Sequence, residues 1–155
     1  SQFTRSDLSG ADLSGATLNE ANFSSCELVG TNFANASMFR INLRSARLTG
    51  AKLMGADLRN AVLQNADLHQ ADLSGAKLAN ADLTNARLEG ARLDGADLQR
   101  ANLRAAKLKG ASLVGANLKG AILTRAVLID ADLSGANLDQ AIFLNTQTEG
   151  CIGCP

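Results

Sequence analysis

Large apolar residues occupy every fifth position of this chain. They run from Phe3 and Leu8 to Phe143 without an insertion or deletion, which gives 29 consecutive positions, of which 24 are Leu, four are Phe and one is Met. The residue two places before each of them is small, and it is Ala in 24 of the 29 units. A period this strict is typical of repeat proteins, so we expect a repeat architecture.

The five-residue period excludes both an α-helix and a continuous β-strand. On a helix, each step of five residues turns the chain by roughly 140°, so the Leu side chains would be spread around the axis and leave no apolar face. In a strand, the Ala and Leu of one unit share a face, but the next Ala comes three residues later and would point outward. A corner is therefore expected in every unit, after a strand of about three residues.

The last residue of each unit is suited to form that corner. It is Gly in 12 units and Asn in six, the two residue types that adopt a positive φ at the lowest cost. A short strand followed by a turn in each unit predicts a chain wound into coils around a core of inward Leu and Ala. The other three residues of each unit are expected to point outward.

The charged residues just before each Leu indicate how many units form one coil. Stacked coils bring residues one coil apart side by side, where opposite charges attract and like charges repel. Four units per coil give seven opposite pairs and two like pairs, whereas three units give two opposite pairs and six like pairs. In the four-unit arrangement Asp67 lies between Arg47 and Arg87. The sequence thus predicts a four-sided coil of 20 residues, and residues 1–145 make 145/20 = 7.25 coils.

Several units match the signature A(D/N)LXX letter for letter. ADLSG begins at Ala11, Ala71 and Ala131, and ANLKG begins at Ala116. On these units, the chain resembles the pentapeptide-repeat family over residues 1–145. The resemblance implies an all-β fold, a right-handed quadrilateral parallel β-helix with four units per coil, which agrees with the charge count. It also implies no shared catalytic activity, since the characterised members act by contacting other proteins.

The repeat divides the chain into the β-helix, residues 1–145, and residues 146–155, which we expect to form a C-terminal capping tail. Thr148 stands where the next Leu would be. No run of about 18 apolar residues predicts a membrane span, and no charged-then-apolar segment predicts a signal peptide. No obvious segment covers the edge of the first coil, and an uncovered edge favours pairing, so we expect a monomer or an end-to-end homodimer.

Residues 21–41 contain most of the departures from the repeat. Met38 beside Ile41 is typical of a flexible side chain that makes room for an oversized neighbour, which favours a locally swollen coil. The alternative is a partner contact formed by three outward apolar residues, Phe39, Val29 and Met54.

Charge alternates in bands along the rod, although the net charge of the chain is zero. The strongest band, residues 98–129, contains no acidic residue and six basic ones: Arg100, Arg104, Lys107, Lys109, Lys119 and Arg125. The four-unit coil spreads them over three sides. A nucleic-acid site needs a concentrated basic face with aromatic residues for stacking, and the chain is only 3% aromatic. Two interpretations stay open for this band, a solvated basic girdle and part of a partner surface.

Outward apolar residues gather near the end of the repeat, at Ile122, Val127, Ile129, Ile142 and Leu144. A tail that folds back needs apolar residues to lie on, so we expect these side chains to support the cap. The alternative is a docking patch for another protein, with Ile129 and Leu144 as its candidate residues.

Cys151 and Cys154 form a CxxC sequence in the tail. Zinc needs about four ligands, and the other candidates, Cys26 and His69, lie several coils away, so we expect no metal site. No helical pattern follows Cys154 to lower a thiol pKa, as in redox enzymes, so a local disulfide or two free thiols remain. Cys26 takes the place of a core Ala and is expected to be an inert buried thiol.

The resemblance to the pentapeptide-repeat family favours one of the two states of the tail cysteines, the disulfide over the free thiols. Pentapeptide-repeat proteins are abundant in cyanobacteria and chloroplasts, some are exported to the thylakoid lumen or the periplasm, and a terminal cysteine pair resembles those members. The resemblance therefore implies a disulfide between Cys151 and Cys154 and an oxidising compartment, with the cytoplasm as the alternative.

No residue pattern indicates an enzyme or a cofactor. The single histidine, His69, has Glu89 one coil on, and such a pair is expected to be a surface ion pair and not a catalytic dyad. We therefore expect a non-enzymatic repeat scaffold that binds an unidentified protein. The resemblance implies one alternative, a DNA-mimicking binder of DNA gyrase like the quinolone-resistance members. Those are strongly acidic rods, and the zero net charge argues against this role.

Overall fold

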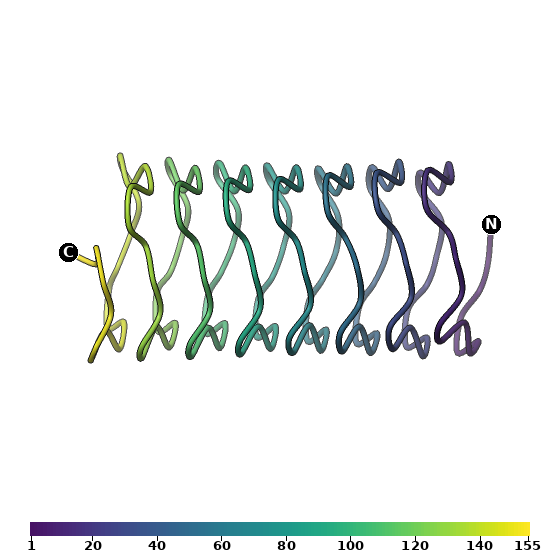
Figure 1. Cartoon of the computed structure of the whole chain (residues 1–155), viewed down its shortest axis with the longest axis horizontal. Coiled ribbons are helices and arrows are strands. Elements are labelled where there is room, and N and C mark those ends of the chain that lie inside the picture. The colour runs from purple at the N-terminus through teal and green to yellow at the C-terminus, as the bar shows by residue number, and fades with distance from the viewer.

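The computed structural model describes residues 1–155 and shows a rod of stacked coils (Figure 1). Its β structure consists of isolated parallel bridges, one at the second residue of each unit. The chain has no helix with the length and apolar character needed to span a membrane. Each bridge joins residues 20 apart, from Gln2 with Asn22 to Asp132 with Ile152. The predicted four-unit coil is confirmed, and the fold is a right-handed, four-sided, all-β solenoid.

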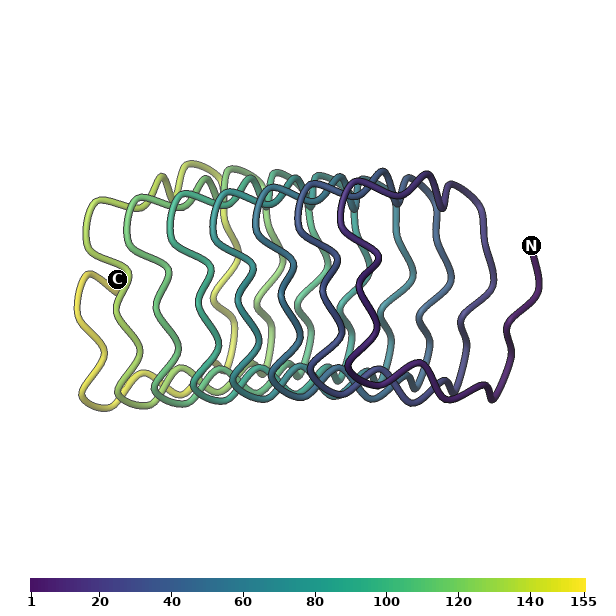
Figure 2. The same ribbon diagram turned by 45° about the vertical axis from the view of Figure 1, so that its right-hand side comes forward.

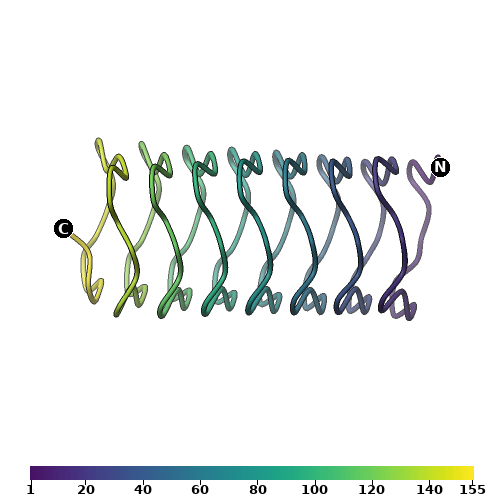
Figure 3. The same ribbon diagram turned by 90° about the horizontal axis from the view of Figure 1, so that it is seen from above.

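The four sides of the rod are numbered by their first units. Side 1 begins at residue 1, side 2 at residue 6, side 3 at residue 11 and side 4 at residue 16, and each recurs every 20 residues. Coils 1 to 7 comprise residues 1–140, and three further units belong to coil 8. The corners of successive coils line up in columns along the rod (Figures 2 and 3). Each residue therefore has its lateral neighbours 20 residues before and after it.

The unit from Ala71 to Gly75 shows how the backbone is hydrogen bonded. The Ala71 N–H donates to the Leu68 carbonyl at 3.0 Å and closes the turn. The Asp72 N–H donates to a carbonyl of the preceding coil at 3.0 Å, and the Leu73 and Gly75 N–H groups donate to carbonyls of the next coil at 2.7 and 2.9 Å. The main chain thus satisfies four of the five N–H groups in the unit.

A side chain satisfies the fifth. The Ser74 N–H donates to Asp72 Oδ1, two residues earlier, at 3.0 Å. All 14 Asp and Asn residues at the second position of a unit accept this bond from the fourth residue. Since a main-chain N–H needs a partner, the Asp or Asn of the repeat acts as a local cap.

The predicted corner residue has the predicted conformation. Every fifth residue from Arg5 to Gly150 has a positive φ, between 54° and 71°. Glycine adopts this region freely, but Arg40 and Ala105 occupy it as well, at a cost of roughly 1–2 kcal/mol for an ordinary L-residue. The repeated turn therefore imposes this backbone conformation even on residues that disfavour it.

The core consists of the first and third residues of each unit. Ala46, Leu48 and their equivalents in coils 2 to 6 are fully buried, whereas the inward residues of coils 1 and 8, such as Phe3 and Phe143, are only partly buried. The Phe3 ring stacks on Phe23 of the next coil with 4.7 Å between centroids. Packing is thus complete in the middle of the rod and open at its two ends.

Three polar residues take the place of Ala in the core. Each donates its S–H or O–H to a main-chain carbonyl 23 residues earlier at 2.7–2.9 Å: Cys26 to Phe3, Thr31 to Leu8 and Thr146 to Leu123. Because a buried polar group is costly only when it lacks a partner, these residues are tolerated without disturbing the coil.

Residues 146–152 continue the coil and do not fold back over its end. Gln147 bridges Val127, as a regular second-position residue does. Gly153 then passes so close to the preceding coil that a Cβ atom there would lie 2.8 Å from the Leu133 carbonyl oxygen. The tail predicted to be a cap is thus built as part of the solenoid, and it does not cover the outward apolar residues of sides 1 and 2.

Candidate interaction surfaces

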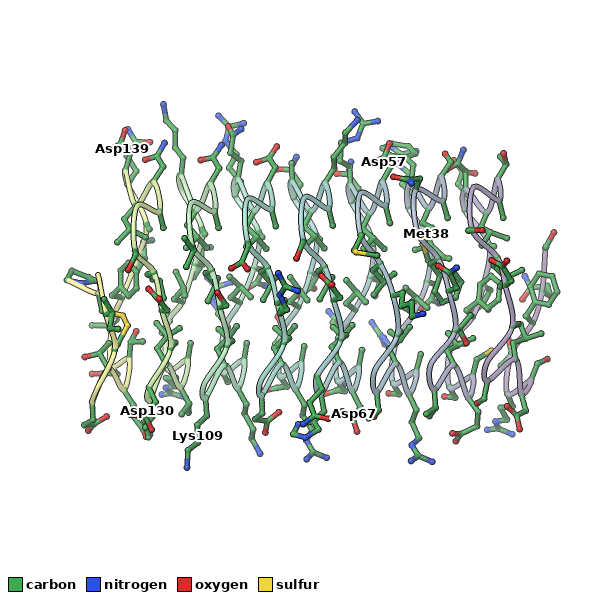
Figure 4. All side chains as sticks on the ribbon, viewed as in Figure 1. Met38, Asp57, Asp67, Lys109, Asp130 and Asp139 are labelled. Atoms are coloured by element: carbon green, nitrogen blue, oxygen red, sulfur yellow. A yellow bond between two sulfur atoms is a disulfide. The ribbon has the colours of Figure 1, made fainter.

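The candidate residues occupy the second, fourth and fifth positions of their units, outside the buried first and third positions. Figure 4 shows the side chains on the ribbon. The structure has no pocket and no cluster of three His, Cys, Asp or Glu side chains that would hold a metal ion. Five large apolar side chains are exposed: Met54, Val114, Ile142, Leu144 and Ile152.

Phe39, on side 4 of coil 2, lies between two guanidinium groups. The Arg40 and Arg59 Cζ atoms lie 5.1 and 5.8 Å from its ring centroid, within the range of cation–π contacts. Arg59 is held by Asp57, with Nη2 2.6 Å from Oδ2, and Arg40 Nη1 lies 3.9 Å from Glu20 Oε1. The ring is half-buried and already has partners within the rod.

Val29 and Met54 do not join Phe39 in one surface. Val29 is half-buried on side 2 of coil 2, and Met54 is exposed on side 3 of coil 3. The three residues occupy three different sides, so a partner that contacts one side of the rod reaches only one of them.

The six basic residues of coils 5 to 7 are all exposed, and none forms an ion pair. Four of them lie on sides 1 and 2: Arg104, Lys107, Lys109 and Arg125. Arg100 and Lys119 belong to side 4. Side 3 carries none of the six, in agreement with the predicted spread over three sides. Lys109 extends from the edge of the rod next to the coil that carries Asp130 (Figure 4).

The outward apolar residues of the last coils share sides 1 and 2 with those four cations. Ile122, Ile142 and Leu144 are on side 1, and Val127 and Ile129 are on side 2. Ile142 and Leu144 are 47% and 61% exposed, and the other three are half-buried. We call these five residues, together with the four basic residues of sides 1 and 2, the basic–apolar corner.

The seven ion pairs of the rod belong to five arginines of coils 2 to 5. Of the seven opposite pairs predicted from the sequence, three are in contact at 3.0–3.8 Å: Glu27 with Arg47, Asp67 with Arg87, and Asp72 with Arg92. The arginine side chains are more than half exposed, so each pair contributes at most about 1 kcal/mol to stability. Five of the nine basic residues before Arg100 thus form ion pairs, whereas the four at the basic–apolar corner form none.

Hydrogen bonds lower the pKa of several aspartates. The Arg59 guanidinium, which donates to both oxygens of Asp57, lowers the pKa of Asp57 below its ordinary value. Burial alone would raise the pKa of Asp82, but the Thr84 hydroxyl and the Gln64 amide donate to its carboxylate, and the net pKa is lowered. These carboxylates are held in their charged form mainly by side-chain donors, and the main-chain N–H bonds that cap the turns contribute less.

His69 and Glu89 do not form the surface ion pair expected from the sequence. They occupy the fourth position on side 2 of coils 4 and 5, and the His69 Nδ1 and Glu89 Oε2 atoms are buried without a hydrogen-bond partner. Glu89 Oε1 instead lies 3.8 Å from Arg87 Nε, and Arg87 also contacts Asp67. Arg87, and not His69, is therefore the basic partner of Glu89.

The terminal cysteines are joined to each other. Cys151 and Cys154 form a disulfide with 5.8 Å between their Cα atoms, on side 3 of coil 8. Cys26 is a free, buried thiol.

A family model described as Pentapeptide repeats (8 copies) matches residues 1–38, 41–80, 71–110 and 106–145. A comparison with curated protein sequences returned no match.

Three solved structures illustrate the similarity. HetL, a pentapeptide repeat protein involved in heterocyst differentiation regulation from the cyanobacterium Nostoc sp. strain PCC 7120, is 32% identical over 97% of this chain and 86% of its own, with a TM-score of 0.47. A trypsin-treated variant of QnrB1, a plasmid-mediated fluoroquinolone resistance protein, is 22% identical over 97% and 79%, with a TM-score of 0.54, a likeness of fold alone. AT2G44920, a pentapeptide repeat protein of the Arabidopsis thaliana thylakoid lumen, is 31% identical over 80% and 69%, with a TM-score of 0.31.

Proposed function

The chain belongs to the pentapeptide-repeat family, and we propose that it is a non-enzymatic scaffold whose outer sides bind another protein. The observation that carries the proposal is that core residues and surface residues occupy separate, fixed positions within each unit. The first and third residues fill the core, and the residues that differ between units point outward from an unchanging backbone. Exposed aliphatic side chains such as Ile142 and Leu144, which a solvated rod does not need, support a binding surface.

Affinity capture tests this proposal. The immobilised protein is incubated with an extract of the organism that encodes it, beside a control rod that keeps all inward residues but carries Ser or Thr at the second and fourth positions. We expect mass spectrometry to identify a protein that the native rod retains and the control rod does not. Retention of nothing, or of the same proteins by both rods, would contradict the scaffold function.

A DNA-mimicking binder of gyrase is the alternative within the family. A DNA mimic needs a strongly acidic surface, whereas this chain has no net charge and carries four unpaired cations at the basic–apolar corner. We expect the protein neither to inhibit the supercoiling activity of gyrase nor to protect it from a quinolone. Protection in that assay would establish the alternative.

The proposed compartment is an oxidising one, the thylakoid lumen or the periplasm, with the cytoplasm as the alternative. The disulfide between Cys151 and Cys154 supports it, because disulfides persist in oxidising compartments and are rare in the cytosol. Cell fractionation combined with alkylation of free thiols before lysis checks the location and the redox state together.

The end coils support a second mode of contact, the end-to-end pairing of two copies. Inward residues such as Phe3 and Phe143 are only partly buried there, and a second chain would shield them and the open ladder edge. Sedimentation velocity over a range of concentrations distinguishes the two states: a monomer throughout would rule out this pairing.

A further inference from the structure

We infer that the basic–apolar corner binds an acidic, partly apolar segment of another protein. The inference rests on the scaffold function proposed above and assigns that function to one place on the rod. Four features of the corner carry it: the contact between its basic and apolar residues, the lack of acidic partners for its cations, the charges at its far end, and its convex shape.

The basic and apolar residues of the corner form one continuous surface. Lys107 is bridged to Val127 on the next coil, and the Gly110 N–H donates to the Ile129 carbonyl at 2.9 Å, so Lys109 lies beside Ile129. On side 1, a bridge joins Ile122 to Ile142. Since neighbouring coils are about 4.8 Å apart, a partner segment of a few residues spans the basic part and the apolar part together.

The cations of the corner lack the carboxylate partners that five arginines of coils 2 to 5 have. Arg87 and Arg92 on coil 5 each contact two carboxylates, but no ion pair involves Arg104, Lys107 or Lys109 one coil later. Apolar residues beside unpaired cations favour a partner that supplies aliphatic side chains and carboxylates at the same time. Such charge complementarity suppresses wrong partners and speeds encounter with the right one.

The far end of the corner has the opposite sign and so sets the direction of binding. Asp130 and Glu149 border it on side 2, with the Asp130 N–H donating to the Glu149 carbonyl at 2.9 Å. A segment bound along the rod therefore has its acidic residues over coil 6 and its uncharged or basic residues over coil 8. The reverse orientation would place carboxylates against carboxylates.

The shape of the surface distinguishes a segment from other partners. The corner is convex and uses two adjacent sides, so a second rod with flat sides contacts only one of them, whereas a peptide or a concave groove follows both. Ile122, Val127 and Ile129 are half-buried in the sides of the rod, so only Ile142 and Leu144 of the five apolar residues are exposed enough to act as anchors in a bilayer. Nucleic acid is disfavoured because the corner holds no aromatic residue for base stacking.

Peptide selection followed by a binding measurement tests the inference. Random peptides displayed on phage are selected on the intact protein, and an enriched sequence is synthesised with a fluorescent label for anisotropy titration. We expect enriched peptides to combine Asp or Glu with Leu, Ile or Val, the acidic residues clustering toward one end. Their affinity is expected to fall as salt concentration rises.

Two double variants with the same change in charge test whether binding depends on the corner or on the whole set of six basic residues. Lys107→Glu with Lys109→Glu is expected to weaken peptide binding by about tenfold or more, whereas Arg100→Glu with Lys119→Glu, on side 4, leaves it nearly unchanged. Leu144→Ser with Ile129→Ser tests the apolar part and is expected to weaken binding as well. All these side chains point outward, and circular dichroism checks that each variant folds.

Several outcomes would overturn the inference. These are enriched peptides without acidic residues, equal losses in the two charge variants, and tighter binding to phosphatidylserine vesicles or to duplex DNA than to the peptides. A dimer in sedimentation that Lys107→Glu with Lys109→Glu dissociates would assign the corner to a second copy instead.

If the native rod and this variant capture the same cellular protein equally, the inference fails while the scaffold function stands. If neither captures any protein, the scaffold function itself fails.

Discussion

Arg59 donates two hydrogen bonds to the carboxylate of Asp57, from Nε to Oδ1 at 2.7 Å and from Nη2 to Oδ2 at 2.6 Å, while its own main-chain N–H is capped by Oδ1 of the same carboxylate. One carboxylate thus caps the turn of its unit and holds one of the two cations that lie over Phe39. The arrangement ties the local backbone, a surface aromatic ring and the ionisation of an acid together, and it makes stability depend on pH.

Stability is expected to fall in acid as the capping aspartates are protonated. The pKa of Asp57 and of Asp82 is lowered from 3.8 by hydrogen bonds that exist only in the folded chain. A lowered folded pKa gives stability that is fully present above the unfolded value and is lost as pH falls through the folded value. The melting temperature should therefore be flat above about pH 5 and decline below about pH 4. Asp57→Asn with Asp82→Asn should reduce this decline in circular dichroism melts, and an unchanged pH profile would refute the assignment.

Removing a second-position cap is expected to destabilise the rod. In Asn102→Ala, the Arg104 N–H, now bonded to Asn102 Oδ1 at 3.2 Å, loses its partner, and unfolding should become easier by roughly 0.5–1.5 kcal/mol. Lys107→Ala, at the same position of the next unit, removes no such bond and should change stability by less than about 0.5 kcal/mol. Chemical denaturation of both variants measures the difference. Equal effects would mean that the cap has no role of its own.

Enlarging a core alanine is expected to be costly. Ala76 is fully buried, so Ala76→Leu should destabilise the rod by about 1–3 kcal/mol through overpacking. Ala79→Leu makes the same chemical change three residues later, at an outward position, and should cost little. Comparison of the two unfolding free energies checks the inward and outward assignment, which equal losses would contradict.

Ala105 is the one alanine at a corner, with a φ of 54°. Ala105→Gly relieves the left-handed strain of an L-residue, partly offset by the greater chain entropy of glycine, and should stabilise the protein by up to about 1 kcal/mol. Ala106→Gly, at the adjacent core position, has no such strain to relieve and should destabilise it. Thermal melting of the pair gives the sign of each effect, and a loss of stability in Ala105→Gly would contradict the argument.

The terminal disulfide is expected in protein isolated from its native compartment. Mass spectrometry without reduction should show the C-terminal peptide about 2 Da lighter than its reduced form, with no link to Cys26, which lies in the core more than six coils away. Cys151→Ser should leave the melting temperature nearly unchanged, since a disulfide across so short a loop restrains the unfolded chain little. Two free thiols in the native protein would remove the support for an oxidising compartment.

The coil and its register could be predicted from the sequence because they depend on a period and on simple charge pairing. Asp67 lies between Arg47 and Arg87 as the charge count predicts. The capping role of the second residue could also have been found from the sequence, because both Asn and Asp occur there. Charge pairing does not explain the Asn residues, whereas the side-chain oxygen that Asn and Asp share does.

Other features depend on rotamers and on distances that a period does not contain. The partners of Phe39 are two arginines, one of which comes from the next coil. His69 fails to pair with Glu89 because Arg87 reaches that carboxylate instead. The tail lacks the apolar centre of the repeat at Thr148, yet it keeps the coil, since main-chain bonds to the preceding coil do not require a leucine.

Each unit turns the chain by a quarter of a revolution around the rod axis. Insertion of one unit therefore rotates all later units by a quarter turn relative to the earlier ones. Duplication of a single five-residue unit between coils 3 and 5 would leave every core position occupied by the same kind of residue. The basic–apolar corner would survive intact, but it would face a quarter turn away from its present direction relative to Phe39. Duplication of four units would restore the original direction and lengthen the rod by about 4.8 Å. Gene duplication can therefore re-aim one recognition surface against another in this architecture without altering either.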